Sequence, residues 1–466
     1  MRNLLSTCLL LGLMSPLSAA DPDWATLDAE TLRHFQALIR MDTQDPPGDE
    51  RPAVEYLKKV LEAEGIPVKI FALDAKRPNL VARLKGNGSR KPLLIMAHTD
   101  VVNVDPSKWP TFGPFSAARE GGHIYGRGTL DDKDNVAASL MTMLVLKRSG
   151  IPLARDVIFL SESGEEGNTK VGIAYMVENH WAEIESEYCL AEGGAVIQRD
   201  GKAISMNVAT TEKVPSRAQL VVKGTAGHGS VPLTDNAIAR LSRAVAKAAD
   251  WDTPMKLNDT TRAYFERLAG ISSPEAAAHY NGLLHPDRSA AAQDYLRRNE
   301  PSHYSMLRTS ISPTIIKAGY RVNVIPAQAE ATLDIRAVPD ENLDTFFADL
   351  ARVIGDDRVE IVRAARDRDP LPPSRIDNEA FRTLETLQRK LYPGAATLPS
   401  MLTGATDMAF LRRRGVQCYG IGPLVDAADA QKGYGPHSDQ ERILEKELYR
   451  FTRFHYEAAA EIARAR

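Results

Sequence analysis

Cysteine is scarce in this chain, with three among 466 residues. Cys8 lies in an apolar N-terminal stretch, so Cys189 and Cys418 are left for the rest of the protein. Two cysteines do not make a disulfide framework, and the sequence does not decide whether they pair. With 43% hydrophobic and 26% charged residues the composition is that of a globular protein, and the length predicts two or three domains.

Long apolar runs and basic clusters are also missing after residue 20, so no later segment is expected to span a membrane. The net charge is −3, which makes nucleic acid an unexpected partner. Residues 1–20 have the features of a secretory signal: Arg2, an apolar stretch too short to span a bilayer, and small residues before a cleavage point. We therefore expect an exported protein, periplasmic or secreted, without membrane attachment once the signal is removed.

Apolar periodicity predicts strands alternating with helices in the first part of the chain. Buried strands are expected over 92–97, 157–160 and 188–191, and a helix follows residue 133 until Gly150. Strands that alternate with helices in this way favour a mostly parallel α/β sheet.

From about residue 210 the predicted order changes to β-α-β-β-α-β, the ferredoxin-like pattern. We expect the α/β domain to comprise 21–209 and 369–466, with an inserted ferredoxin-like α+β domain over 210–368. A long helical insertion, 251–304, lies between the first helix and the second strand of that pattern.

Histidine and acidic residues follow the predicted strands of the α/β domain. His98 ends one strand, Glu165 and Glu166 lie in a Gly-flanked loop after another, and Glu192 ends a third. Ligands of open α/β sheets bind at the carboxyl ends of strands, so these side chains are expected to face one site. Adjacent carboxylates diverge, so one can bind a cation while the other handles a proton.

Two further residues complete this set: Asp131 precedes the predicted helix, and His437 lies in a loop of the returning segment. Imidazole and carboxylate are ligands of zinc and similar divalent ions. Two histidines and three carboxylates could hold two ions, with one carboxylate bridging them. Taken singly, each acid is more often a solvated or capping group and each histidine more often structural. Only their shared location favours a metal site.

Five motifs in this chain resemble those of the two-zinc metallopeptidases and amidohydrolases, a family that includes aminoacylase, succinyl-diaminopimelate desuccinylase and glutamate carboxypeptidase. The motifs occur in the family's order over nearly the whole mature chain, and the inserted domain is similar to the family's lid. They are His98-Thr-Asp100, Gly126-Arg-Gly-Thr-Leu-Asp131-Asp-Lys133, Gly164-Glu-Glu-Gly167, Glu192-Gly-Gly194 and Gly435-Pro-His437.

The resemblance implies two Zn²⁺ ions per chain, with Co²⁺ or Mn²⁺ as alternatives. His98 and Glu192 would bind one ion, Glu166 and His437 would bind the other, and Asp131 would bridge them.

Further roles follow from the same resemblance. Glu165 would be the general base that takes a proton from the attacking water. Asp100 would fix the ring of His98 through the second ring nitrogen. The peptide bond between Asp131 and Asp132 would be cis, as it often is in the family.

The resemblance also extends to the lid and the substrate loop. His228 would help to stabilise the oxyanion, often from a second subunit, so a homodimer through the lid is one expected assembly. Asn323 and Gly404 would contact substrate, and Arg336 would grip a substrate carboxylate. A turn histidine and a surface salt bridge are structural alternatives for His228 and Arg336. The long insertion departs from the family pattern and leaves the dimer contact and the pocket size open.

We therefore expect an exported zinc hydrolase of the carboxypeptidase or N-acyl-amino-acid hydrolase type. It would cut an amide bond next to a free carboxylate, in a small peptide or an N-acyl amino acid. An aminopeptidase or dipeptidase of the same family is one alternative. A non-catalytic, metal-dependent peptide-binding protein is another, which the retained Glu165 disfavours. The chain has no Gly-x-Ser-x-Gly and no His-Glu-x-x-His motif, so a serine hydrolase or one-zinc protease has no support.

Overall fold

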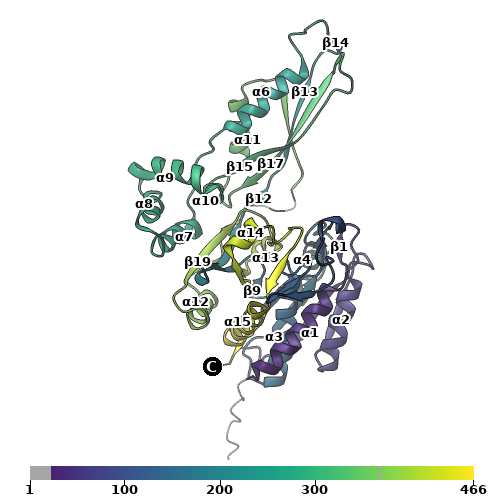
Figure 1. The fold of residues 1–466 in the computed structure, drawn as a ribbon, viewed down its shortest axis with the longest axis vertical. Helices are drawn as coiled ribbons and strands as arrows, with labels where there is room; N and C mark the ends of the chain where they lie inside the picture. Colours follow the sequence, from purple (N-terminus) through teal and green to yellow (C-terminus); the bar gives the residue numbers. More distant parts are fainter. Residues whose placement is uncertain (1–21, 367, 369, 466) are drawn as a thin grey trace, which may run out of the picture.

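The computed structural model describes residues 22–366, 368 and 370–465. The predicted signal sequence, residues 1–20, lies outside this described part. Figure 1 shows a large domain with a central sheet between helices and an elongated second domain that projects from it. Four helices, α7 to α10, lie beside the junction of the two domains (Figure 1).

A ten-stranded sheet forms the centre of the large domain. Its central strands β8, β4, β9 and β20 are parallel, whereas β2 and β3 at one edge run antiparallel to their neighbours. The expected mostly parallel α/β sheet is thereby confirmed. In sheet order the strands are β2 (Val68–Phe71), β3 (Asn79–Leu84), β8 (Val157–Glu162), β4 (Leu93–His98), β9 (Tyr188–Ala191), β20 (Gln417–Gly420), β11 (Lys202–Glu212), β10 (Ala195–Arg199) and β21 (Leu424–Asp426), with β19 (Ala396–Leu402) paired to β11.

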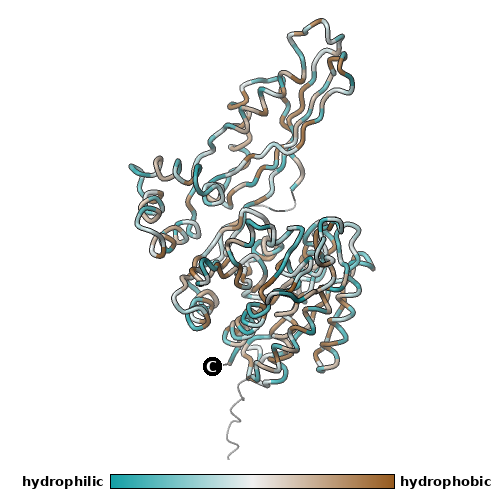
Figure 2. Tube along the Cα trace, viewed as in Figure 1, coloured by the Kyte–Doolittle hydropathy of each residue, from teal (hydrophilic) through white to brown (hydrophobic). Residues whose placement is uncertain are grey.

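Helices cover both faces of this sheet because the side chains of its strands alternate between two apolar cores. In β4, Leu93 and Ile95 join one core, whereas Leu94 and Met96 join the other. Figure 2 shows the apolar residues gathered inside the large domain. The first core is covered by α1 (Trp24–Ile39), α2 (Arg51–Ala63), α3 (Lys133–Ser149), α12 (Glu379–Leu391) and α15 (Glu445–Ala463), and the second by α4 (Ile173–Asn179), α5 (Trp181–Ile184) and α13 (Met408–Arg413).

Helix α3 is the predicted helix after residue 133, and it is buried more completely than its apolar stripe indicates. Every residue from Lys133 to Leu146 is buried, because the helix contacts β4 on one side and α1 and α15 on others. It ends at Gly150, whose φ of 60° is the left-handed conformation that glycine adopts at helix ends. Asp132 occupies the N-cap position without a capping hydrogen bond from its side chain, and Asp131 directly precedes it at the helix N-terminus.

Several strands of the large domain are not predicted by the sequence pattern. Strand β11 carries Ser, Asn and Thr side chains among its apolar ones and therefore lacks an alternating pattern. Strand β20 has four residues, too few for a periodicity to appear. The remaining short elements are β1 (Gln44–Asp45), β5 (Val101–Val102), the 3₁₀ helix Pro106–Lys108, β6 (Ala118–Glu120), β7 (His123–Tyr125), α14 (Ala427–Gln431) and β22 (Arg442–Leu444).

The second domain is the expected ferredoxin-like lid. Its main strands lie in the order β18, β13, β17, β15, all antiparallel, and both of its long helices share one core with this sheet. Strand β11 of the large sheet continues to Glu212, and the domain limits at 209 and 368 stay predictions. The lid elements are β12 (Val214–Pro215), β13 (Ala218–Lys223), β14 (Gly227–His228), α6 (Ala237–Asp250), β15 (Ser310–Ala318), β16 (Val324–Ile325), β17 (Gln328–Ala337), α11 (Leu343–Ile354) and β18 (Val359–Arg363).

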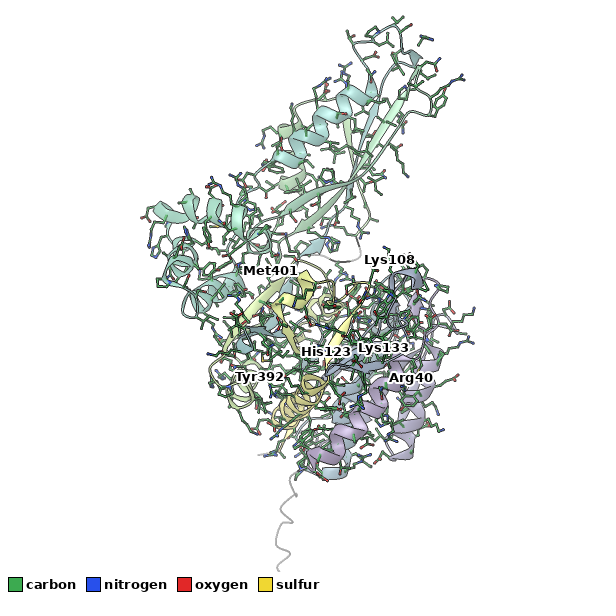
Figure 3. All side chains as sticks on the ribbon, in the orientation of Figure 1. Arg40, Lys108, His123, Lys133, Tyr392 and Met401 are labelled. Carbon is green, nitrogen blue, oxygen red and sulfur yellow. The ribbon has the colours of Figure 1, made fainter. Side chains whose placement is uncertain are left out.

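The helical insertion packs against the large domain. Phe265 of the insertion shares an apolar core with Leu398 and Met401 of β19, and Figure 3 labels Met401 at this junction. The hydroxyl groups of Thr210 and Thr260 lie 2.7 Å apart across the same junction. The insertion therefore connects the lid to the central sheet. Its helices are α7 (Asp259–Ala269), α8 (Pro274–Gly282), α9 (Pro286–Asn299) and α10 (Pro301–Met306).

The sequence analysis raised two further points, the state of the two cysteines and the presence of a membrane-spanning segment. Cys189 and Cys418 are register partners on the adjacent strands β9 and β20, and both are buried free thiols. Within the described residues, no helix combines the length and the apolar character that a membrane span requires.

Candidate metal centre

The carboxyl ends of three strands bring the predicted ligands together. His98 is the last residue of β4, Glu192 directly follows β9, and the loop after β8 carries Glu165 and Glu166. The ligand atoms of His98, Asp131 and Glu166 lie within 4.8 Å of one another, as do those of His98, Glu165 and Glu192. The set expected from the strand ends is therefore one spatial cluster.

Asp131 lies between the two histidines. One carboxylate oxygen, Oδ1, lies 3.1 Å from Nε2 of His98, and the other, Oδ2, lies 2.9 Å from Nε2 of His437. Nε2 of His437 also lies 3.0 Å from Oε1 of Glu166. Each oxygen of Asp131 thus faces a different histidine, which is the arrangement of a carboxylate that bridges two ions. The peptide bond between Asp131 and Asp132 is cis, as expected.

Asp100 organises the loop that carries the paired glutamates. Its Oδ1 accepts hydrogen bonds from the N–H groups of Gly164 and Glu165 at 2.8 and 3.2 Å, and its Oδ2 accepts one from Glu166 at 3.0 Å. Nδ1 of His98 lies 3.0 Å from the carbonyl oxygen of Asp100 and 3.6 Å from its carboxylate. The carbonyl oxygen is therefore the nearer partner of the ring, whereas the carboxylate accepts the N–H groups of the loop.

Glu441 supports the neighbouring loop, and the sequence analysis did not identify it. This buried carboxylate accepts hydrogen bonds from the N–H groups of Gly128 and Leu130 at 3.1 and 2.7 Å, and it pairs with Arg127 at 2.7 Å. These contacts fix the segment that ends at Asp131. Glu441 follows His437 by four residues, but no spacing rule marks it as a partner of residues more than 300 positions earlier.

Negative charge is concentrated around this cluster. Burial, and next the nearby Asp407, raise the pKa of Glu165 well above its usual range. Burial and the charge of Glu165 do the same for Glu192. Carboxylates that crowd each other in this way favour a proton or a cation between them.

The two histidines respond to the same surplus of negative charge. Hydrogen bonds to Asp131 and Glu166 raise the pKa of His437 to about 10. Burial opposes charge on His98, yet its hydrogen bonds to Asp100 and Asp131 raise its pKa above the usual value. Asp131, which contacts both rings, has a lowered pKa even though burial opposes its ionisation. Imidazole and carboxylate donors in this surplus of negative charge fit a pair of divalent cations.

Two further acids lie buried behind the loop. Glu162 and Asp407 each have a carboxylate oxygen without a hydrogen-bond partner among the described residues. Burial raises the pKa of Asp407 to about 7, although Arg368 donates a hydrogen bond to it at 3.3 Å. The sequence analysis proposed Gly404, three positions earlier, as a site residue but did not propose Asp407.

The predicted lid residues His228 and Asn323 lie together at one end of the lid. Strand β14, which ends at His228, pairs with β16, and the N–H of Gly229 donates to the carbonyl of Asn323 at 2.9 Å. Nδ1 of His228 lies 2.7 Å from Oγ of Ser230, and the residue is exposed. Figure 1 shows β14 at the end of the lid that points away from the large domain. The fold therefore does not bring His228 to the metal cluster of its own chain.

Arg336 and Gly404 lie nearer to the large domain. Arg336 of β17 is the register partner of Pro215 of β12, close to where the chain enters the lid. Nε of Arg336 donates a hydrogen bond to the carboxylate of Asp334 at 3.1 Å. This ion pair is the structural alternative considered for Arg336. Gly404 lies in the exposed loop after β19.

Comparisons with known proteins place this site in a family. The sequence profile described as peptidase family M20/M25/M40 matches residues 94–461. The chain is 29% identical over 391 residues to the probable carboxypeptidase S-like 2 of Dictyostelium discoideum, covering 81% of this chain and 73% of that protein. It is 30% identical over 351 residues to the N-fatty-acyl-amino acid synthase/hydrolase PM20D1 of Homo sapiens, covering 72% of this chain and 67% of that protein.

The fold is also similar to that of a solved structure. The M20 family metallo-carboxypeptidase from Sulfolobus solfataricus superimposes with a TM-score of 0.71 at 19% identity, covering 92% of this chain and 98% of that chain. The family match covers most of the chain and includes all the predicted metal ligands. The chain therefore belongs to peptidase family M20/M25/M40 and is a metallohydrolase of the peptidase or amidohydrolase type.

Proposed function

We propose that the protein is an exported hydrolase that holds two zinc ions and cleaves an amide bond next to a free carboxylate. The observation that carries the proposal is the position of Asp131, which presents one oxygen to His98 and the other to His437. His98 and Glu192 would hold one ion, and Glu166 and His437 would hold the other. The apolar character of residues 1–20 supports export to the periplasm or the medium.

Glu165 is the proposed general base. When bound, a pair of divalent ions supplies Lewis-acid activation of a water and of the scissile carbonyl. Glu165 takes the proton of the attacking water and then gives it to the leaving nitrogen.

The proposed substrate class rests on Arg336, a candidate carboxylate-binding residue, and on the descriptions of the relatives. Peptide C-termini and N-acyl amino acids both have an amide next to a carboxylate, and a substrate carboxylate that binds the planar fork of Arg336 would replace Asp334 as its partner. The relatives are described as a carboxypeptidase-like protein and an N-fatty-acyl-amino acid hydrolase, and these two substrate types share that chemistry.

Replacement of the base tests the mechanism. Glu165→Gln keeps the size of the side chain but cannot accept the proton, so we expect the kcat for N-acyl amino acids and dipeptides to fall about 10²–10⁴-fold. Zinc content, measured by plasma mass spectrometry, should stay equal to that of the wild type. Glu178→Gln, an exposed change on α4, is the matched control. Wild-type turnover by the Glu165→Gln variant would refute the assigned role.

We also propose that two copies associate and that His228 of one copy completes the site of the other. The position of His228 at the far end of its own lid supports this arrangement (Figure 1). A mixture of Glu165→Gln and His228→Ala chains should then recover activity that neither variant has alone. In the mixed dimer, the site with an intact Glu165 receives an intact His228 from its partner. If mixing under conditions that exchange subunits recovers no activity, His228 does not act across subunits.

A further inference from the structure

An apolar cavity of about 300 Å³ adjoins the metal cluster, and none of the predicted site residues lines it. Three segments that carry metal ligands each contribute to its wall. Leu130 precedes Asp131, Gly194 follows Glu192 by two positions, and Pro436 precedes His437. The cavity therefore lies beside the backbone of three segments that carry predicted metal ligands. We call it the β10 cavity, after one of the strands that line it.

The other walls of the β10 cavity are apolar. Ala195 and Ile197 of β10 are half-buried, and Ile197 is the register partner of Val425 on β21. Leu424 and Ile443 are buried beneath them, with 3% and 1% of their surfaces exposed. The volume lies at the lower end of the range for small-molecule sites, about 300–1,000 Å³.

Charge in the β10 cavity is paired internally. Its one cationic side chain, among the described residues, is Arg442, which donates to both oxygens of Asp429 at 2.8 and 3.1 Å and lies over the ring of Tyr434. The other ionisable residue there, Asp426, accepts a hydrogen bond from Gln198. A substrate carboxylate would find no free cation in this cavity, so the amino-acid half of the substrate does not suit it.

We propose that the β10 cavity receives the acyl half of the substrate and selects an apolar chain. This inference rests on the proposed function and adds to it the class of acyl group, namely unbranched aliphatic chains longer than acetyl. The chain would enter between the segments of Leu130 and Gly194 while its amide carbonyl stays at the metal cluster. Transfer of each methylene from water into the cavity would raise kcat/KM about fourfold until the cavity is filled.

A second cavity provides the control. It has about 690 Å³ and lies between β10, β11 and the helical insertion, where Ala276, Tyr280 and Glu300 line it. The hydroxyl of Tyr280 donates to Glu300 at 2.9 Å, and His303 pairs with the same carboxylate. This polar lining does not suit an aliphatic chain, so filling this cavity should leave acyl selectivity unchanged.

The experiment compares N-acetyl, N-butyryl, N-hexanoyl and N-octanoyl derivatives of one amino acid with the full mature, zinc-loaded protein. For the wild type we expect kcat/KM to rise from acetyl to hexanoyl by at least tenfold. Ala195→Trp fills the β10 cavity and should lower the octanoyl-to-acetyl ratio of kcat/KM at least tenfold, whereas Ala276→Trp should keep the wild-type ratio. Thermal unfolding checks that each variant folds.

A second variant and a binding measurement keep the test decisive. Val425→Ala widens the β10 cavity, whereas Val425 does not line the second cavity. This variant should move the optimum to a longer chain, and it is a milder change than Ala195→Trp. Calorimetric binding of octanoate should weaken at least tenfold in Ala195→Trp relative to Ala276→Trp. If the wild type is active but its kcat/KM does not change with acyl chain length, the proposed role of the β10 cavity is wrong. It is also wrong if Ala195→Trp and Ala276→Trp have equal octanoyl-to-acetyl ratios of kcat/KM. In both cases the proposed function stands. If the wild type cleaves dipeptides but no member of the series, the acyl cavity is overturned and the proposed function stands. If it cleaves neither dipeptides nor any member of the series, both are overturned.

Discussion

At the scale of single residues, Asp100 has a larger structural role than a partner of one histidine. Its carboxylate accepts hydrogen bonds from three backbone N–H groups, and these belong to the loop that carries the proposed base and a proposed metal ligand. Its carbonyl oxygen lies against Nδ1 of His98. A single residue thus positions parts of two neighbouring strand ends.

Asp100→Asn should disturb this loop selectively. Asparagine has one acceptor oxygen, so either the two donors at Oδ1 or the one at Oδ2 would face an amide N–H₂ group. We expect a loss of about 10–100-fold in activity or metal affinity, as for other groups that orient metal ligands. Kinetics and zinc titration measure the effect, and Asp105→Asn at an exposed turn is the control. Equal kinetics for the two variants would remove the proposed role of Asp100.

Four of the five proposed metal ligands could be predicted from sequence because each follows a recognisable strand or precedes a recognisable helix, whereas His437 lies in a loop and was identified through its motif. Glu441 and Glu162 could not be predicted in this way. Glu441 acts on residues more than 300 positions away, and Glu162 is the last residue of a strand whose apolar pattern ends before it. For Asp100 the residue was predicted, but the choice of carbonyl over carboxylate depends on the path of the loop.

At the scale of elements, helices α3 and α15 meet through a buried histidine. His455 of α15 lies 2.8 Å from the hydroxyl of Thr142 and 3.5 Å from that of Ser139, both on α3. Burial lowers the pKa of His455 from 6.5 to about 3, since no carboxylate compensates its charge. This contact should therefore make the large domain sensitive to acid.

The direction of this pH effect follows from the two pKa values. In the unfolded chain the histidine binds a proton below pH 6.5, whereas in the folded protein it stays neutral to about pH 3. The stability that depends on neutral His455 is thus fully present above pH 6.5. As the pH falls toward 3, the free energy of unfolding decreases by up to about 1.4 kcal/mol per pH unit. Denaturant unfolding between pH 7 and 4 should show a shallower acid loss in His455→Gln than in the wild type, with the exposed His285→Gln as control. Parallel pH profiles would contradict this.

For the helical insertion, the sequence pattern predicts helices but not the surface against which they pack. Its helices were predicted, but their partner is β19, a strand that lies more than 90 residues later and has no clear sequence signal. Helix periodicity identifies an apolar face but not the surface that it covers. The same limit applies to β10 and β11, which were not predicted.

Phe265→Ala tests whether the insertion is part of the packed core. Phe265 is fully buried against residues of β19, so its truncation should lower the free energy of unfolding by about 3–5 kcal/mol. Ile271→Ala, at a position that is 39% exposed, should cost about 0.5 kcal/mol. Urea unfolding of the two variants measures the difference, and comparable losses would show that the insertion does not depend on β19.

At the scale of the whole molecule, metal binding should stabilise the fold because the site joins segments from both parts of the large domain. His98 and Asp131 come from the first part, and His437 comes from the returning segment. Zinc at about 1,000 times its dissociation constant should raise the free energy of unfolding by about 4 kcal/mol. Chelation should lower the Tm, and zinc should restore it in the wild type but less in His437→Ala. An unchanged Tm on chelation would contradict this coupling.

The two-domain organisation was predictable because strand–helix alternation and the ferredoxin-like order are local patterns. The projection of the lid, with His228 at its far end, was not, because the path of the chain at the junction depends on contacts such as Thr210 with Thr260. Nor did the sequence reveal the β10 cavity, whose walls come from segments about 300 residues apart.

The central claim is that five side chains hold two divalent ions with Asp131 shared between them. Counting zinc per chain by plasma mass spectrometry, after dialysis against a low zinc concentration, tests it most directly. We predict two ions per chain in the wild type and in Glu165→Gln, and fewer than two in both His98→Ala and His437→Ala. A folded wild type that binds no zinc, or histidine variants that both keep two ions, would contradict the account.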